Sequence, residues 1–335
     1  MYLSKQTVQT HLYFFIVAIF VSYWVANREI NNVADTMNYA QNFVHKTDLT
    51  LNYEFLFDFI TYIIRIFTDN YVIYFFILNF ILNLILFRVV YSIANYFNFN
   101  KLNFFLCILC LLLVSSWYHS SAFNGLRQGL ALALCYYSFI CYLDQRNKIK
   151  SLLSFISSCF FHYSNFLIIP FIFLFRLSIN KFYIFLNILG LFYFLNINEI
   201  IVEKLSSIFS LPIYYEIKNY TEDGDISYRY GFQLDLFIYT MFFVHVYWLF
   251  NRLYIKNNEN FSNIVKLFYI LVCPYFVFGF AGYSNRYGVI AWFFSVFING
   301  CILYFLVINN DRKFLGNFLI ILFMFCILLF YFRFF

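Results

Sequence analysis

The stretch YVIYFFILNFILNLILFRVV, residues 71–90, holds a single charged side chain, Arg88. A helix needs about 20 predominantly apolar residues to cross the ~30 Å hydrocarbon core of a bilayer, and this stretch has that length. Comparable runs recur along the chain, at about residues 11–27, 71–90, 102–117, 122–143, 151–175, 182–196, 230–250, 264–281, 287–308 and 315–332. The sequence therefore predicts a polytopic helical membrane protein.

The composition supports the same fold class. Of the 335 residues, 63% are hydrophobic and 11% are charged, and the mean hydropathy is +0.74. A soluble domain carries about 25% charged residues, so a water-soluble fold is excluded, and the 52 Phe and 31 Tyr exclude a disordered chain. We expect an all-α integral membrane protein, one domain over residues 1–335, with about 10–11 transmembrane or re-entrant helices.

Charges in the connecting segments predict how the chain is oriented. Basic residues with few acids mark one set of connections: Lys5, Arg88, Lys101, Arg146, Lys148, Lys150, Arg176, Lys181, Arg252, Lys256, Lys266, Arg312 and Lys313. Acidic residues gather instead in 28–70 and in 197–229. Because basic loops remain in the cytoplasm, both acidic segments are predicted to lie outside, 197–229 as the larger outer loop. This orientation requires 151–175 to begin and end on the cytoplasmic side, as a hairpin would. The polar residues in the middle of this run and Pro170 predict that it is bent, broken or re-entrant.

Residues 53–69, within the first outer loop, have the pattern of an amphipathic helix. Their polar side chains fall on one helical stripe: Glu54, Asp58, Thr61, Arg65 and Asp69. Aromatic and aliphatic side chains surround this stripe, which predicts a helix lying in the outer membrane interface. Glu54 and Asp58 are candidates for proton transfer at the outer face, although any amphipathic helix needs a polar stripe.

The segment Phe123–Ala131, FNGLRQGLA, carries the sharpest polar motif. In one continuous helix, Asn124, Arg127 and Gln128 would share a face. An arginine just inside a membrane is usually retained for a partner, and its forked donors suit phosphate or pyrophosphate oxygens. Arg127 is therefore a candidate anion-binding and catalytic residue, with Asn124 and Gln128 as substrate-binding neighbours. The alternative is an interfacial arginine that reaches toward lipid headgroups.

Two further residues are candidates for the general base. His162 lies in an apolar run beside Ser164 and Asn165, where an imidazole could accept a proton or could simply pack against a carbonyl. Asp35 lies in the first outer loop, one helical turn before Tyr39. Its carboxylate could orient a base or accept a hydroxyl proton, or could be a solvated loop acid. Tyr39 is a candidate substrate-binding residue.

Arginines beside tyrosines occur at two other positions on the predicted outer side. Arg286 precedes Tyr287 at the start of a span, and Arg229 lies between two tyrosines at the end of the larger outer loop. Tyrosine faces can stack on sugar rings while arginine binds hydroxyls or phosphates, so all three are candidate substrate-binding residues. Interfacial anchoring explains the same pattern. The Asp223–Asp225 pair in the outer loop is interpreted as a solvated turn rather than a metal site.

These motifs together resemble the EpsG family of bacterial exopolysaccharide proteins, which is related to the Wzy oligosaccharide repeat-unit polymerases. The resemblance rests on Asp35-x-x-x-Tyr39, Tyr53-Glu54-Phe55-Leu56-Phe57, Asn124-x-x-Arg127-Gln128-x-x-Ala131, Phe161-His162-x-Ser164 and Arg286-Tyr287. It implies a GT-C-like glycan polymerase architecture in the bacterial cytoplasmic (inner) membrane. It also implies polymerisation of undecaprenyl-pyrophosphate-linked oligosaccharide units into O-antigen, capsule or exopolysaccharide at the outer face.

The expected chemistry is a glycosyl transfer without metal or other cofactor. Arg127, with Arg286 or Arg229, would stabilise the departing pyrophosphate, and His162 or Asp35 would take the proton from the attacking hydroxyl. The expected partners are the lipid-linked oligosaccharide, the bilayer and a chain-length regulator protein, but no nucleic acid. A flippase or transporter, an acyltransferase and an O-antigen ligase are the alternatives. The sequence does not define the sugar, its linkage, the chain length or the oligomeric state.

Overall fold

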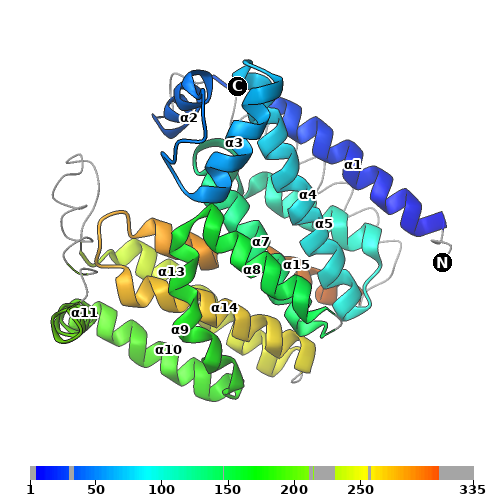
Figure 1. Ribbon diagram of the computed structural model, residues 1–335. Coiled ribbons are helices and arrows are strands. Elements are labelled where there is room, and N and C mark those ends of the chain that lie inside the picture. Colours follow the sequence, from blue (N-terminus) through cyan, green and yellow to red (C-terminus); the bar gives the residue numbers. More distant parts are fainter. Residues whose placement is uncertain are drawn as a thin grey trace. The chain divides into compact units, whose positions relative to one another are not determined.

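A computed structural model describes residues 5–29, 34–145, 147–210, 214, 231–255 and 258–308. Helices make up nearly all of the described residues, and these residues contain no strand (Figure 1). The chain divides into two compact units, the first formed by residues 1–165 and 299–335 and the second by 166–298. The all-α fold class is therefore confirmed.

Six described helices are long and apolar enough to cross a membrane. They are α1 (Lys5–Ala26, over Gln9–Ala26), α4 (Tyr71–Phe97), α7 (Leu126–Leu143), α13 (Leu234–Leu253), α14 (Glu259–Phe278) and α15 (Asn285–Ile308, over Asn285–Leu306). Two bent helix pairs raise the number to as many as eight: α5 (Lys101–Val114) with Ser116–Asn124, and α10 (Ile179–Phe194) with α11 (Ile197–Ile208). These helices match eight of the ten expected runs, and the run 315–332 lies outside the described residues.

The remaining expected run, 151–175, is not a continuous span. Helix α8 (Lys148–Phe161) ends at His162, whose backbone is extended. Short 3-10 and α turns follow, namely η2 (Tyr163–Ile168), α9 (Ile169–Ile172) and η3 (Phe173–Arg176). The predicted break is present, and it places His162 at a helix end rather than within a helix.

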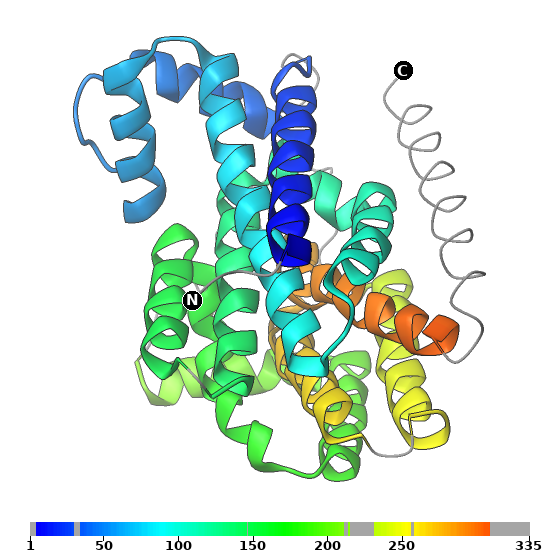
Figure 2. The ribbon, with the colours of Figure 1, turned by 90° about the vertical axis from the view of Figure 1, so that its right-hand side faces the viewer.

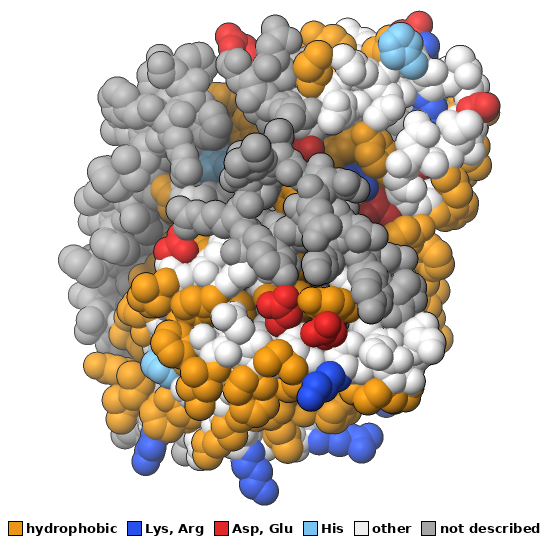
Figure 3. All heavy atoms as spheres, turned by 90° about the vertical axis from the view of Figure 1, so that its left-hand side faces the viewer, with side chains coloured by type: hydrophobic (Ala, Val, Ile, Leu, Met, Phe, Trp, Pro, Cys, Tyr) orange, Lys and Arg blue, Asp and Glu red, His pale blue; other side chains and the backbone are white. Residues whose placement is uncertain are grey.

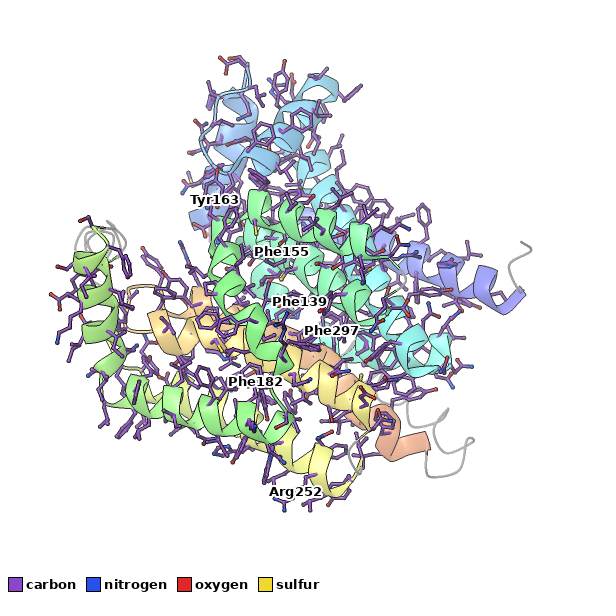
Figure 4. The ribbon with its side chains drawn as sticks, turned by 60° about the horizontal axis from the view of Figure 1, so that its bottom comes forward. Phe139, Phe155, Tyr163, Phe182, Arg252 and Phe297 are labelled. Carbon is purple, nitrogen blue, oxygen red and sulfur yellow. The ribbon has the colours of Figure 1, made fainter. Side chains whose placement is uncertain are left out.

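In the first unit, α1 packs along α4, α4 along α7, and α7 along α8 (Figure 2). The rings of Phe139 on α7 and Phe155 on α8 face each other with their centres 5.9 Å apart (Figure 4). Asn83 of α4 donates to Ser22 of α1 at 3.1 Å and accepts from the hydroxyl of Tyr118 at 2.7 Å. Such polar contacts fix helix pairs where lipid offers no hydrogen-bond partner.

Helices α2 (Ala34–His45) and α3 (Phe55–Phe67) also belong to the first unit. The polar stripe expected to face water turns inward instead, since Asp58 is 1% exposed and Glu54, just before α3, is 6% exposed. Apolar side chains of α3 face outward, and Phe67 at its end is 82% exposed. The difference arises because Asp58 and Glu54 find cationic partners inside the protein, whereas Asp69 at the far end of the stripe is 80% exposed.

In the second unit, α14 packs against α10, α11 and α13. Tyr193 of α10 is fully buried, and its hydroxyl donates to the carbonyl of Gly279 at 3.2 Å. The outer faces of α10 and α13 are apolar, with Ile184, Ile188, Ile238 and Phe242 exposed. Hydrophobic side chains gather over the lower part of the described surface drawn in Figure 3, as expected for helices that contact lipid.

Candidate functional site

Three segments of the first unit bring a carboxylate, a guanidinium and an imidazole together. Glu54 comes directly before α3, Arg127 lies in the first turn of α7, and His162 follows α8. Nη1 of Arg127 donates to Oε2 of Glu54 at 2.5 Å, and Nδ1 of His162 lies 2.6 Å from Oε1 of the same carboxylate. Glu54 thus bridges Arg127 and His162, and the three residues are called the charged cluster below.

The charge of Glu54 is set by these two partners. Burial alone would raise the pKa of its carboxyl, but the hydrogen bond and charge of His162, followed by those of Arg127, outweigh burial and lower the pKa to about 2. Glu54 is therefore a carboxylate at neutral pH. Because a carboxylate only accepts hydrogen bonds, we assign the donor at 2.6 Å as Nδ1–H of His162.

Two tyrosines surround the guanidinium of Arg127. Its Nε donates to the hydroxyl of Tyr39 at 3.1 Å, and its Cζ lies 4.4 Å from the centre of the Tyr53 ring. Burial raises the pKa of both tyrosines, so their hydroxyls remain protonated at neutral pH. Tyr53 also accepts from Nδ2 of Asn42 at 2.5 Å. This shell holds the planar guanidinium in one orientation.

A buried ion pair fixes the connection that carries Tyr53 and Glu54. Nζ of Lys46 lies 2.9 Å from Oδ1 of Asp58, and both side chains are 2% exposed. Lys46 also donates to the carbonyl of Thr50 at 2.7 Å, while Oδ2 of Asp58 accepts from the backbone N–H of Tyr53 at 2.6 Å. Both ends of the connection between α2 and α3 are thereby tied down.

The start of α7 differs from the expected continuous helix. Asn124 ends the π-helical turn η1 (Ser120–Asn124), and α7 begins after Gly125. Asn124 therefore does not share a helical face with Arg127 and Gln128, which were expected to lie beside it. A Cβ at Gly129 would lie 2.7 Å from the carbonyl oxygen of Ser121, so glycine permits α7 to pack closely against the turn before it.

The second ring nitrogen of His162 is available for chemistry. Among the residues that the structure describes, the side chain of His162 bonds through Nδ1 alone, to Glu54. Buried polar atoms without a hydrogen-bond partner follow directly, namely Oγ of Ser164 and both amide atoms of Asn165. Oδ1 of Asn124 is also buried without a hydrogen-bond partner among the described residues. Buried polar atoms of this kind are expected to bind water or ligand.

The other predicted site residues are distributed over both units. Asp35 forms no ion pair with the described residues, although its charge contributes to the raised pKa values of Tyr39 and Tyr53. Arg286 and Tyr287 open α15 in the second unit, where Cζ of Arg286 lies 4.4 Å from the centre of the Tyr283 ring. Arg229 lies outside the described residues. The roles of all these residues remain predictions.

Sequence reasoning did not anticipate the central position of Glu54. It treated this carboxylate as an alternative to Asp35 and assigned no role to Tyr53. The available signal was the Tyr53-Glu54 dipeptide, which carried part of the family resemblance. Contacts from Glu54 to Arg127 and to His162 span 73 and 108 residues of sequence, and no local pattern encodes them.

The fold and this site define a polytopic helical membrane protein with a charged cluster built from three separate segments. Among the described residues, no three side chains of His, Cys, Asp or Glu gather as a group that could hold a metal ion. The chain belongs to the EpsG family, which matches residues 11–335. EpsG proteins are bacterial membrane proteins of polysaccharide biosynthesis. No curated protein and no solved structure matches the chain.

Proposed function

We propose that this protein polymerises oligosaccharide repeat units linked to undecaprenyl pyrophosphate, at the outer face of the bacterial cytoplasmic membrane. Family membership supports a polysaccharide polymerase role. The observation that carries the proposal is the charged cluster, in which one carboxylate holds a cation and an imidazole side by side. Glycosyl transfer from a lipid pyrophosphate needs a group of each kind, one for the departing anion and one for the hydroxyl proton.

His162 is the proposed general base. With Nδ1–H donated to Glu54, its Nε2 is the proton acceptor, and the carboxylate stabilises the imidazolium that forms. The hydroxyl oxygen of the acceptor sugar attacks the anomeric carbon of the donor, and its proton moves to Nε2. The bond between the anomeric carbon and the pyrophosphate oxygen breaks, so that undecaprenyl pyrophosphate leaves with the electron pair. Asp35, which has no comparable partner in the described structure, is the less favoured base.

Arg127 is the proposed ligand of the leaving group. Nη1 is bound to Glu54 and Nε to Tyr39, and Nη2 bonds to none of the residues that the structure describes, so its N–H groups are proposed to donate to phosphate oxygens. Because the guanidinium is held in place before substrate arrives, it stabilises negative charge without reorganising. Asn124, Gln128 and Tyr39 are proposed to position the sugar or phosphate. Arg229, Arg286 and Tyr287 are retained as proposed contacts of the remaining substrate.

The test is the surface-glycan pattern of a strain that lacks the gene, complemented with variants of known membrane level. Polymerase function predicts that the deletion strain makes single-unit glycan without a ladder. Arg127→Lys and His162→Gln should fail to restore the ladder, whereas the control Arg65→Lys should restore it, because Arg65 pairs with Asp69 away from the charged cluster.

Other outcomes would identify the alternative functions. Loss of all surface glycan would indicate a flippase, and polymer that stays on its lipid carrier would indicate a ligase. A changed acetylation pattern with a normal ladder would indicate an acyltransferase. A normal ladder and normal glycan in the deletion strain would refute the polymerase proposal outright.

A further inference from the structure

A second arginine of the first unit, Arg28, has a guanidinium that forms no ion pair with a carboxylate of the described residues. It follows α1, and its Nη1 donates to the carbonyl of Val25 at 2.9 Å. Its Nη2 makes a long contact of 3.5 Å with the hydroxyl of Thr36, and its Nε is buried without a hydrogen-bond partner. Among the described residues, no carboxylate lies within ion-pair distance of this guanidinium.

Arg28 differs from three other cations of this unit, which lie beside α2, on α3 or in the charged cluster, although Arg88 and Lys101 elsewhere in the unit also contact an aromatic ring, that of Tyr91. Lys46 pairs with Asp58, Arg65 with Asp69, and Arg127 with Glu54. Arg28 instead lies over aromatic rings, with its Cζ 4.3 Å from the centre of Phe75 and 5.5 Å from the centre of Phe123.

Burial lowers the pKa of Arg28 to about 10, so the side chain is still charged at neutral pH. Ring faces and one helix carbonyl stabilise a cation, but they leave its net charge in place.

Helix α2 connects Arg28 to the charged cluster. The contact of Arg28 is with Thr36, and that of Arg127 is with Tyr39. Thr36 and Tyr39 are three residues apart in α2, so they share a face and are separated by about 5 Å along the helix axis. Thr36 also donates to the carbonyl of Phe123 at 2.6 Å, which ties this face to the segment before α7. The two arginines therefore approach the same short stretch of α2.

We propose that Arg28 and Arg127 form a two-cation site for a pyrophosphate group, with Arg28 supplying a charge that no carboxylate of the described residues pairs with. This inference rests on the proposed function, because it names Arg28 as a substrate-binding residue for the lipid pyrophosphate. Arg127 shares its charge with Glu54, so it alone offers less than one full positive charge. A diphosphate carries more charge than one such group can balance, and the guanidinium of Arg28, which contacts α2 one helical turn from the contact of Arg127, would supply the remainder.

The test measures binding of inorganic pyrophosphate to the full-length protein in phosphatidylcholine nanodiscs, by calorimetry and by ligand-induced thermal shift. Wild type is expected to bind, and Arg28→Gln is expected to weaken binding at least about tenfold, since a hydrogen bond to a charged group is lost. Arg65→Gln is the matched control. Arg65 also donates to a helix carbonyl, that of Val44, and lies over an aromatic ring, that of Phe43, but it already has a carboxylate. Its loss should leave pyrophosphate affinity within about twofold of wild type.

A structural role of Arg28 at the end of α1 would lower thermal stability without ligand but would not change the ligand-induced shift. If Arg28→Gln does not fold, Arg28→Lys is used instead. This variant keeps the charge but lacks the planar N–H donors of the guanidinium, and it should bind pyrophosphate several-fold more weakly than wild type. Unchanged affinity in the folded Arg28 variants, or no binding by wild type, would overturn the inference. The measurement is repeated in nanodiscs that also contain phosphatidylglycerol. If Arg28→Gln changes the thermal shift only in these nanodiscs, the inference is also overturned, because Arg28 would then bind a lipid headgroup.

Failure of the polymerase proposal is distinguishable from failure of this inference. A normal glycan ladder in the deletion strain refutes the polymerase but leaves pyrophosphate binding through Arg28 intact. With the purified enzyme, Arg28→Gln should mainly raise KM for the lipid-linked donor, because the ground-state pyrophosphate already carries its charge. A lost ladder together with pyrophosphate binding that does not depend on Arg28 would refute only the two-cation site.

Discussion

Replacing Glu54 by Gln tests the charged cluster most simply, because the substitution keeps the shape and removes the charge. The amide offers one acceptor oxygen where the carboxylate offers two, while Arg127 and His162 both donate to this position. The N–H of either Arg127 or His162 would therefore face the NH2 group of the glutamine, which cannot accept a hydrogen bond. The buried guanidinium would also lose its counter-ion.

The size of the effect follows from the pKa of Glu54. Its fall from 4.5 to about 2 corresponds to at most about 3–4 kcal/mol of folding free energy, at about 1.4 kcal/mol per pH unit, because part of the fall comes from the charge of a protonated His162, which the neutral imidazole of a general base lacks. Since the folded-state pKa is the lower one, this stabilisation is fully present above about pH 4.5 and is lost as pH falls through about 2. Glu54→Gln should therefore lower the free energy of unfolding at pH 7, and the difference from wild type should shrink below pH 4.5.

Activity should fall further than stability alone explains. Without the carboxylate, the imidazole of His162 must compete with Arg127 for one neutral acceptor oxygen and loses the negative charge that stabilises the imidazolium, and the equivalent Asp→Asn change in a Ser-His-Asp enzyme slows catalysis by about 10⁴-fold. We expect at least about a 100-fold loss of polymerisation rate with the purified, folded variant. The control Glu203→Gln removes an exposed carboxylate from α11 and should change neither quantity. A Glu54→Gln protein that is as stable and active as wild type would refute the cluster.

Three further predictions test the surrounding structure. Arg127→Lys keeps the charge but loses the forked donors, so polymerisation should fall at least about tenfold while the protein still folds, as judged by size-exclusion profile and ladder. Lys46→Met leaves Asp58 buried and unpaired, which should cost about 3–5 kcal/mol in an unfolding titration, whereas a loss under about 1 kcal/mol would show that the pair is not buried in solution. Gly129→Val forces a side chain against Ser121 and should lower the melting temperature, while the smaller Gly129→Ala should lower it less.

The sequence predicted the spans well because each depends on local composition. The apolar run at residues 71–90 became α4, and the polar interruption after Phe161 became the break at which α8 ends and His162 lies. Helical periodicity also found the stripe of α3 correctly. It failed to predict which way the stripe faces, because an inward stripe and an outward one have the same spacing, and the choice depends on distant partners such as Lys46 and Arg127.

The candidate site was predictable only in part for the same reason. Arg127 and His162 stand out singly as polar groups in apolar runs. Glu54, whose carboxylate bridges them, does not stand out in this way, because it lies in a segment where acidic residues are common. The single helical face expected for Asn124 and Arg127 was wrong because Gly125 separates a π-helical turn from α7. Local spacing does not reveal such a change of helix type.

The central claim is that Glu54 and His162 act as one unit in proton transfer, and a double-mutant cycle tests it most directly. Polymerisation rates would be measured for the purified wild type, Glu54→Gln, His162→Gln and the double variant under one set of conditions. If Glu54 acts mainly through His162, the double variant loses far less rate than the product of the two single losses, and any loss beyond that of His162→Gln comes from Arg127, which Glu54 also holds. If the two losses multiply, the residues act independently and the account is contradicted.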